Sequence, residues 1–126
     1  MSNVDLLNGS VLAYMGDAYW SLLVREYLID KGFTKAKDLQ KESVKYVSAK
    51  AQARFIHEFE DMFDAKDLEI FKRGRNYKST SVPKNTDVST YRISTGFEAV
   101  VGYWYLTKQE SKLMALWNKV KTMMEE

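Results

Sequence analysis

The fold is decided by the stretch from Ser10 to Lys31, which reads SVLAYMGDAYWSLLVREYLIDK. Its large apolar side chains recur every three or four residues, which is the spacing of an α-helix; they are Leu12, Met15, Tyr19, Leu22, Leu23 and Tyr27. Gly32 follows, and glycine is typical of the position after a helix. We therefore predict a helix that begins near Ser10 and ends at Gly32. Because it is apolar over more than one face, we expect it to lie at the centre of the fold.

The same spacing recurs along the rest of the chain, with no sustained alternation of the kind that predicts strands. The predicted elements are a helical turn over 33–39, a helix over 42–62, a third helix capped by Asp64 that turns basic at Lys72, a helix that begins at Thr86 or Ser89 and runs to Lys108, and a last helix over 109–124. The helix ending at Lys108 is also apolar over more than one face, so we expect it to pair with the first. The segment 76–87, with the only proline, Pro83, is predicted to be a loop. We expect an all-α fold and one domain over 1–126.

Composition excludes several classes of protein. The chain has 126 residues and no cysteine, so disulfides and thiolate metal sites are excluded and oxygen ligands would have to hold any metal. Met1–Leu7 has no basic stretch followed by an apolar run, and no window approaches the roughly 20 apolar residues that span a bilayer. We therefore expect neither secretion nor membrane insertion, and the lack of cysteine is compatible with a reducing cytoplasm.

Positive charge is concentrated in one segment. The formal net charge is only +2, but residues 71–93 carry a local balance of +5 and the rest of the chain sums to −3. A basic segment of this kind is either a solvated loop or a surface that attracts polyanions.

Two carboxylates stand alone in the two helices expected to be central. Asp17 lies within Leu12–Ala18, and Glu98 lies within Thr95–Gly102 among small residues that allow a close helix approach. A carboxylate in an apolar helix must face solvent, be paired or bind a cation, because its burial alone is costly. Asp17 can face water, and Glu98 can pair with Arg92 or a lysine. The other hypothesis is a Mg²⁺ site, since Mg²⁺ favours one or two carboxylates with waters and phosphates.

These segments carry a family resemblance. Leu12–Ala18, LAYMGDA, is similar to the signature of the ribonuclease III family, and the segment 96–106 resembles that family's second motif, both in the expected order. The resemblance spans about residues 8–124. It implies an all-helical homodimeric nuclease domain, with Asp17 as the catalytic aspartate and Glu98 as the metal-binding glutamate.

Two positions depart from the longer members of the family. Those enzymes carry a glutamate four residues before the aspartate and usually an aspartate three residues before the glutamate, whereas this chain has Ala13 and Thr95. Both departures, and the segments 72–79, 83–87 and 91–92, resemble the short Mini-ribonuclease III branch, which lacks the double-stranded-RNA-binding domain. This resemblance implies maturation of the large-subunit ribosomal RNA precursor in the cytoplasm.

The resemblance also implies a mechanism and a substrate. Water would attack a phosphodiester of double-stranded RNA and leave a 5′-phosphate and a 3′-hydroxyl, with Mg²⁺, or Mn²⁺ in its place, near Asp17 and Glu98. A-form RNA is bound through phosphates and 2′-hydroxyls. The predicted RNA-binding residues are Arg73, Arg75, Asn76, Lys78, Ser79, Lys84, Asn85, Thr86 and Arg92.

Two alternatives remain open. One is a non-catalytic relative that binds double-stranded RNA, in which Ala13 and Thr95 mark lost chemistry. The other is a helical protein–protein module without an RNA role. His57 is expected to be a surface or satisfied helix residue, and no role is assigned to Asp38 or Asp87.

Overall fold

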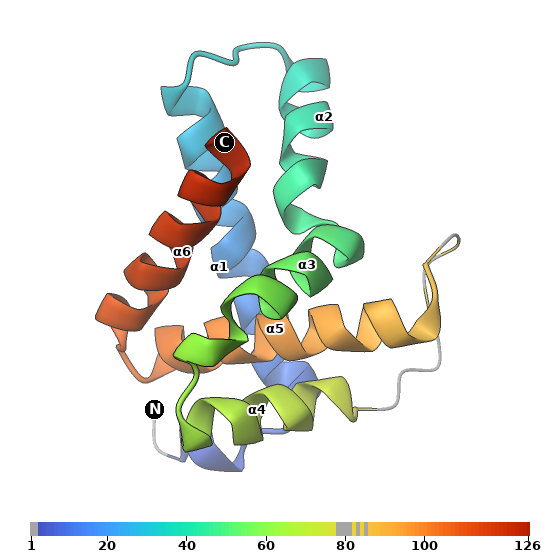
Figure 1. Ribbon diagram of the computed structural model, residues 1–126, viewed down its shortest axis with the longest axis vertical. Helices are drawn as coiled ribbons and strands as arrows, with labels where there is room; N and C mark the ends of the chain where they lie inside the picture. Colours follow the sequence, from blue (N-terminus) through green and yellow to red (C-terminus); the bar gives the residue numbers. More distant parts are fainter. Residues whose placement is uncertain (1–2, 78–81, 83, 85) are drawn as a thin grey trace.

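The computed structural model describes residues 3–77, 82, 84 and 86–126, and over these residues it contains helices and no strands. The elements are η1 (Val4–Leu6), α1 (Gly9–Asp30), α2 (Ala36–Val47), α3 (Ala49–Phe59), η2 (Glu60–Met62), α4 (Ala65–Arg75), α5 (Val88–Leu106) and α6 (Glu110–Glu125). The predicted all-α fold is therefore confirmed. In Figure 1, α4 and α5 lie side by side in the lower half, while α1, α2 and α6 extend upward.

The predicted central pair is also confirmed, because α1 and α5 form the most extensive contact between two elements. The two helices cross with their backbones touching (Figure 1). A Cβ atom built on Gly102 would stand 1.9 Å from the main-chain oxygen of Leu12. Only glycine fits such an approach, so the small residues noted in the sequence set how closely the helices pack.

The predicted single helix over 42–62 is wrong. The chain forms two helices, α2 and α3, which are separated at Ser48, and α2 begins at Ala36, earlier than expected. Ser48 has an extended backbone, with ψ of 155°, and its side-chain oxygen accepts a hydrogen bond from the amide of Ala51 at 3.1 Å. A serine that caps the following helix redirects the chain even though the apolar spacing continues through it.

Local capping accounts for the end of α1 and for the starts of α4 and α5. Gly32 has φ of +103° and ends α1 as predicted. Asp64 caps α4 through a reciprocal pair of hydrogen bonds with Asp67, a capping box. Asp87 caps α5 by accepting from the amide of Thr90 at 2.9 Å, so the helix begins between the two predicted positions. In the predicted loop 76–87, none of the described residues is helical, and residues 78–81, 83 and 85, including Pro83, lie outside the described residues.

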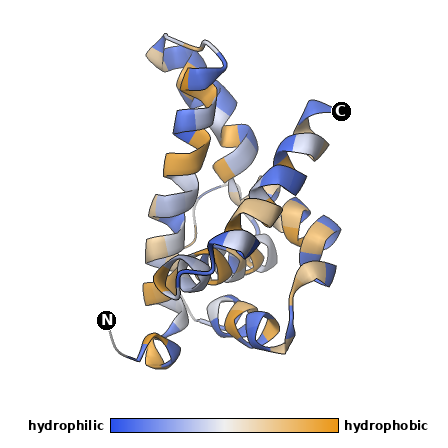
Figure 2. Ribbon diagram, turned by 90° about the vertical axis from the view of Figure 1, so that its left-hand side faces the viewer, coloured by the Kyte–Doolittle hydropathy of each residue, from blue (hydrophilic) through white to orange (hydrophobic). Residues whose placement is uncertain are grey.

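The core is built from large aromatic side chains. Trp20, Trp104, Phe55 and Phe97 are almost fully buried. The indole of Trp20 donates to the main-chain oxygen of Tyr46 at 2.9 Å, so its burial leaves no unpaired polar group. Hydrophobic residues also lie along α1 at one edge of the molecule (Figure 2). Among the described residues, none of the helices is both long and apolar enough to span a bilayer.

Candidate active site

The crossing of α1 and α5 brings Asp17 and Glu98 together. A Cβ atom built on Gly16 would stand 1.7 Å from the main-chain oxygen of Glu98, so the backbone next to Asp17 rests directly on Glu98. Asp17 is exposed and Glu98 is half-buried, and their carboxyl groups are within hydrogen-bonding range of each other. Asp17 therefore faces solvent, which was one of the alternatives for this residue. It also lies beside Glu98, as a shared Mg²⁺ site would require.

The environment of Glu98 favours its protonated form. Burial, and then the neighbouring carboxylate of Asp17, raise the pKa of Glu98 from 4.5 to about 9. The side-chain amide of Gln52 donates to Oε2 of Glu98 at 3.4 Å and acts in the opposite direction. Within the described residues no lysine or arginine forms an ion pair with Glu98, so the predicted pairing with Arg92 is not found there. Asp17 and Glu98 are thus a pair of neighbouring carboxyl groups for which the described part of the chain offers no ion-pair partner.

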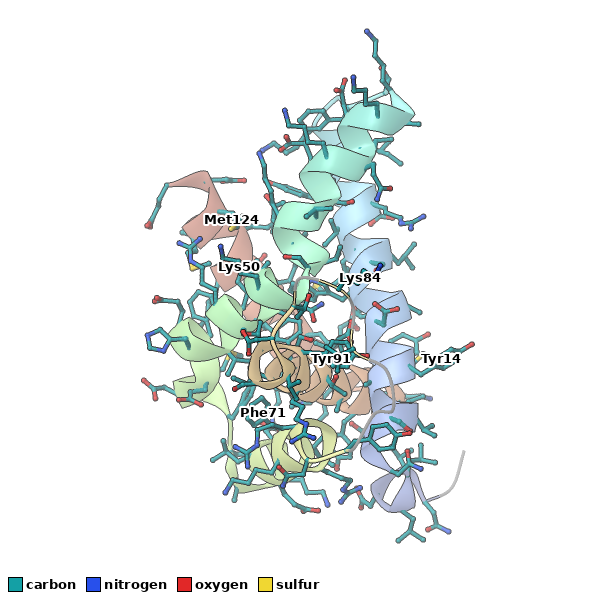
Figure 3. All side chains as sticks on the ribbon, turned by 90° about the vertical axis from the view of Figure 1, so that its right-hand side faces the viewer. Tyr14, Lys50, Phe71, Lys84, Tyr91 and Met124 are labelled. Carbon is teal, nitrogen blue, oxygen red and sulfur yellow. The ribbon has the colours of Figure 1, made fainter. Side chains whose placement is uncertain are left out.

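A cavity of about 210 Å³ opens beside these carboxyl groups. It is lined by Ser10, Ala13, Tyr14, Asp17, Tyr77, Tyr91, Thr95 and Glu98. Tyr14 on α1 and Tyr91 on α5 both lie on the face shown in Figure 3. The site is therefore open to a ligand and is bordered by phenol groups that can donate or accept hydrogen bonds.

The predicted RNA-binding residues divide into groups. Arg73 bonds inside the protein: its guanidinium donates to the main-chain oxygens of Asp5 at 2.7 Å and Leu7 at 2.9 Å, and to the carboxylate of Glu69. Lys84 is exposed on the face in Figure 3, and Thr86 lines a small pocket with Lys50. Lys78, Ser79 and Asn85 lie outside the described residues.

Arg75, Asn76 and Arg92 come together in a second cavity, of about 730 Å³, between α3, α4 and α5. Arg75 lies over the ring of Phe71, 5.7 Å from its centroid, and its Nε donates to Oδ1 of Asn76 at 3.2 Å. The exposed side chain of His57 lines the same cavity. The prediction that His57 is a surface residue is confirmed, and its place beside two arginines was not foreseen.

Asp38 and Asp87 lie away from the carboxylate pair. Asp38 is exposed in the first turn of α2. Asp87 caps α5, and its carboxylate also accepts from the hydroxyl of Thr90 at 2.6 Å, which lowers its pKa. Neither residue lines the cavity that contains Asp17 and Glu98.

Comparison with known proteins decides the family. The ribonuclease III domain family matches residues 10–109, a range that includes Asp17, Glu98 and both glycines of the helix crossing. The chain belongs to the ribonuclease III family. It is 51% identical to the Mini-ribonuclease 3 of Streptococcus pneumoniae, over 92% of each chain, and 46% identical to that of Staphylococcus aureus, over 99% of this chain and 95% of the relative.

A solved structure shares this fold. A protein from Fusobacterium nucleatum, 29% identical, superimposes with a TM-score of 0.87 over 95% of this chain and 98% of the other. The ribonuclease III fold is therefore shared along nearly the full length of both chains.

The two departures from the longer ribonuclease III enzymes lie in the site itself. Ala13 and Thr95 both line the cavity beside Asp17 and Glu98. Among the described residues there is no group of three or more acids or histidines that could hold a metal. A pair of carboxylates beside open space still fits Mg²⁺, because Mg²⁺ retains several waters and needs few protein ligands.

Sequence reasoning missed part of the site in this ribonuclease III domain. Tyr77 and Tyr91 line the cavity, although their positions in the sequence give no sign of it. Gln52 was also missed, although a signal was available: it is a polar residue on the apolar face of α3, next to buried Phe55 and Ile56.

Proposed function

We propose that this protein is a metal-dependent endoribonuclease that hydrolyses phosphodiesters of double-stranded RNA. The observation that carries the proposal is the convergence of Asp17 and Glu98 at the crossing of α1 and α5, beside an open cavity. Membership of the ribonuclease III family supports the reaction, and the relatives named Mini-ribonuclease 3 support the short form of the enzyme. The products would be a 5′-phosphate and a 3′-hydroxyl.

Asp17 and Glu98 would hold the metal, Mg²⁺ or Mn²⁺ in its place. When bound, the cation would lower the pKa of the attacking water and stabilise charge on the phosphate. The protein supplies the geometry: the glycine contacts fix the two carboxyl groups beside each other. Because the pKa of Glu98 is about 9 without metal, its carboxyl keeps a proton at neutral pH, and a cation must displace it.

With two carboxylates in place of four, we expect weak metal affinity in the absence of RNA. More of the coordination would come from water and from the phosphates of the substrate. Tyr77 and Tyr91, at the rim of the cavity, are placed to hydrogen-bond the ribose or phosphate of the strand that enters it.

Contacts with the RNA backbone are proposed for the basic residues around the α4–α5 connection. Arg75, Asn76 and Arg92 line one cavity, where their side chains can form hydrogen bonds to the same stretch of phosphates. Lys84 and Thr86, with Lys78, Ser79 and Asn85, complete the proposed surface. Arg73 belongs to the same predicted set, but its guanidinium is already bonded within the protein, so we expect its share of binding to be small.

We propose that the active form is a homodimer, because a duplex has two strands and a two-fold pair of sites would meet one strand each. α1 exposes large apolar side chains: Val11, Tyr14, Leu22 and Ile29 are 44%, 81%, 61% and 59% exposed. Val11, Leu22 and Ile29 fall within about 20° of one another around the helix. Such a stripe is suited to a second copy of the chain.

The cellular role that we propose is maturation of the large-subunit ribosomal RNA precursor in the cytoplasm. Its support is the resemblance to the Mini-ribonuclease III branch. Cells that lack the protein should accumulate precursor with unprocessed ends, which primer extension on total RNA would detect.

The decisive experiment is cleavage of a long RNA duplex in Mg²⁺ by the wild-type protein, with Asp17→Asn as the inactive control. Denaturing electrophoresis and end-labelling would give the product ends. Binding of the duplex without cleavage by the wild-type protein would favour the non-catalytic RNA-binding alternative. A lack of any salt-dependent binding would favour a protein–protein module.

A further inference from the structure

Gln52 is a polar residue on the buried, otherwise apolar face of α3. It is only 1% exposed and lies beside the buried side chains of Phe55 and Ile56. Burial of an amide is costly unless hydrogen bonds replace those it makes with water. Its amide nitrogen donates to Oε2 of Glu98 at 3.4 Å. The buried face of α3 is therefore connected directly to Glu98.

The other buried polar residues have structural partners. Asp67 accepts from the indole of Trp104 at 2.8 Å and pairs with Lys112 at 3.1 Å, while the hydroxyl of Ser94 donates to a carbonyl oxygen one turn earlier in its own helix. Of the three buried polar residues in the described part of the chain, Gln52 is the one whose side chain contacts a proposed metal ligand.

The chemistry of an amide suits that position. The NH₂ group only donates, so it can occupy one oxygen of Glu98 and leave the other for a ligand on the side of Asp17. An amide is also neutral. A lysine or arginine in its place would pair with Glu98 and compete with a cation for the same charge.

We propose that Gln52 is a positioning residue that orients the carboxylate of Glu98 for a divalent cation. This inference rests on the proposed function of the Asp17–Glu98 pair. Because Ala13 and Thr95 line the cavity without offering a carboxylate, the orientation of each remaining ligand matters more than in a site with four acids. Hydrogen-bond partners behind metal ligands commonly change metal affinity by about 10- to 100-fold.

The test is Gln52→Met, which keeps the length and approximate volume of the side chain but removes the donor. We expect the Mg²⁺ concentration for half-maximal cleavage to rise by about 10- to 100-fold, with kcat at saturating Mg²⁺ changed by no more than about 3-fold. Direct Mn²⁺ binding, followed by electron paramagnetic resonance without RNA, should weaken by the same factor. Gln40→Met, at an exposed position of α2, is the matched control.

Gln52→Asn is the second variant, because it keeps an amide that is one methylene too short to reach Glu98. If either variant folds, as judged by circular dichroism and a cooperative melt, and binds Mn²⁺ as the wild type does, the inference is overturned. Failure of the proposed function has a different signature. In that case the wild-type protein does not cleave at any Mg²⁺ or Mn²⁺ concentration, and the Mn²⁺ comparison still decides the role of Gln52.

Discussion

Gly16 rests on the main-chain oxygen of Glu98, so closely that a Cβ atom at Gly16 would stand 1.7 Å from it. The contact fixes the distance between the axes of α1 and α5. It also places the next residue, Asp17, beside the side chain of Glu98. The glycine of the first motif is therefore part of the site, because it determines whether the two carboxyl groups can meet.

Gly16→Ala is predicted to separate the two carboxyl groups. The methyl group would meet backbone, which cannot rotate away, so the helices must move apart. We expect a loss of about 1–3 kcal/mol in the free energy of unfolding and a loss of about 100-fold in cleavage rate, since a 1 Å displacement in a site has this effect. Urea unfolding and single-turnover cleavage would measure the two.

The control is Gly32→Asn, at a position where no atom lies within 4 Å of a new Cβ. Its positive φ should lower stability by about 1 kcal/mol without a change in cleavage rate. Equal cleavage by the Gly16→Ala protein and the wild type would show that the helix contact does not position the site.

The sequence predicts the helices well where apolar spacing alone decides them. The spacing in α1 and α5 is unbroken, and both helices appear as predicted. The break at Ser48 was missed because apolar residues recur at the same spacing on both sides of it. The hydrogen bond from the amide of Ala51 to the side chain of Ser48 caps a new helix there. The spacing of apolar residues gives no indication of such a bond.

The candidate site was predictable in its residues but not in its geometry. Two isolated carboxylates in two apolar helices were visible, while their contact depends on where the helices cross. A count of basic residues likewise does not distinguish Arg73, whose guanidinium bonds to the N-terminal segment, from Arg75 and Arg92, which line a cavity. These distinctions arise from tertiary packing.

Glu98→Gln is predicted to make the metal-free protein more stable than the wild type, by an amount that increases with pH. The unfolded chain releases the proton of Glu98 near pH 4.5, whereas burial and Asp17 raise the pKa in the folded protein to about 9. Between these values the unfolded state binds fewer protons, so the stability of the wild type falls with increasing pH. Glutamine does not ionise and avoids this loss. The melting temperature of the variant relative to wild type should therefore rise by several degrees from pH 5 to pH 8.5 in EDTA.

The same Glu98→Gln protein should be inactive, so stability and cleavage are expected to change in opposite directions. Glu58→Gln, at an exposed position of α3, is the control and should follow the wild type at every pH. Parallel melting curves for wild type and Glu98→Gln across this range would contradict the raised pKa.

Arg75→Ala with Arg92→Ala is predicted to weaken binding of duplex RNA of any sequence. If each arginine contacts one phosphate, the slope of log K against log salt should decrease by about two. Arg73→Ala should lower the melting temperature, because it removes the bonds to Asp5 and Leu7, with little change in that slope. Filter binding, with each change made in the Asp17→Asn protein, would measure the salt slopes, and thermal denaturation would measure the melting temperature. An equal decrease in slope for Arg73→Ala would place that residue on the RNA as well.

Leu22→Lys is predicted to dissociate the protein into monomers. Leu22 is 61% exposed and lies in line with Val11 and Ile29 on α1, so a charge there would be buried in a dimer that uses this stripe. In a monomer the same change would alter stability by no more than about 0.5 kcal/mol, because the position is already exposed to solvent. Sedimentation equilibrium would give the molecular mass, and Val44→Lys, on an exposed apolar position of α2, is the matched control. A Leu22→Lys protein with the mass and cleavage rate of the wild type would remove this face of α1 as the interface.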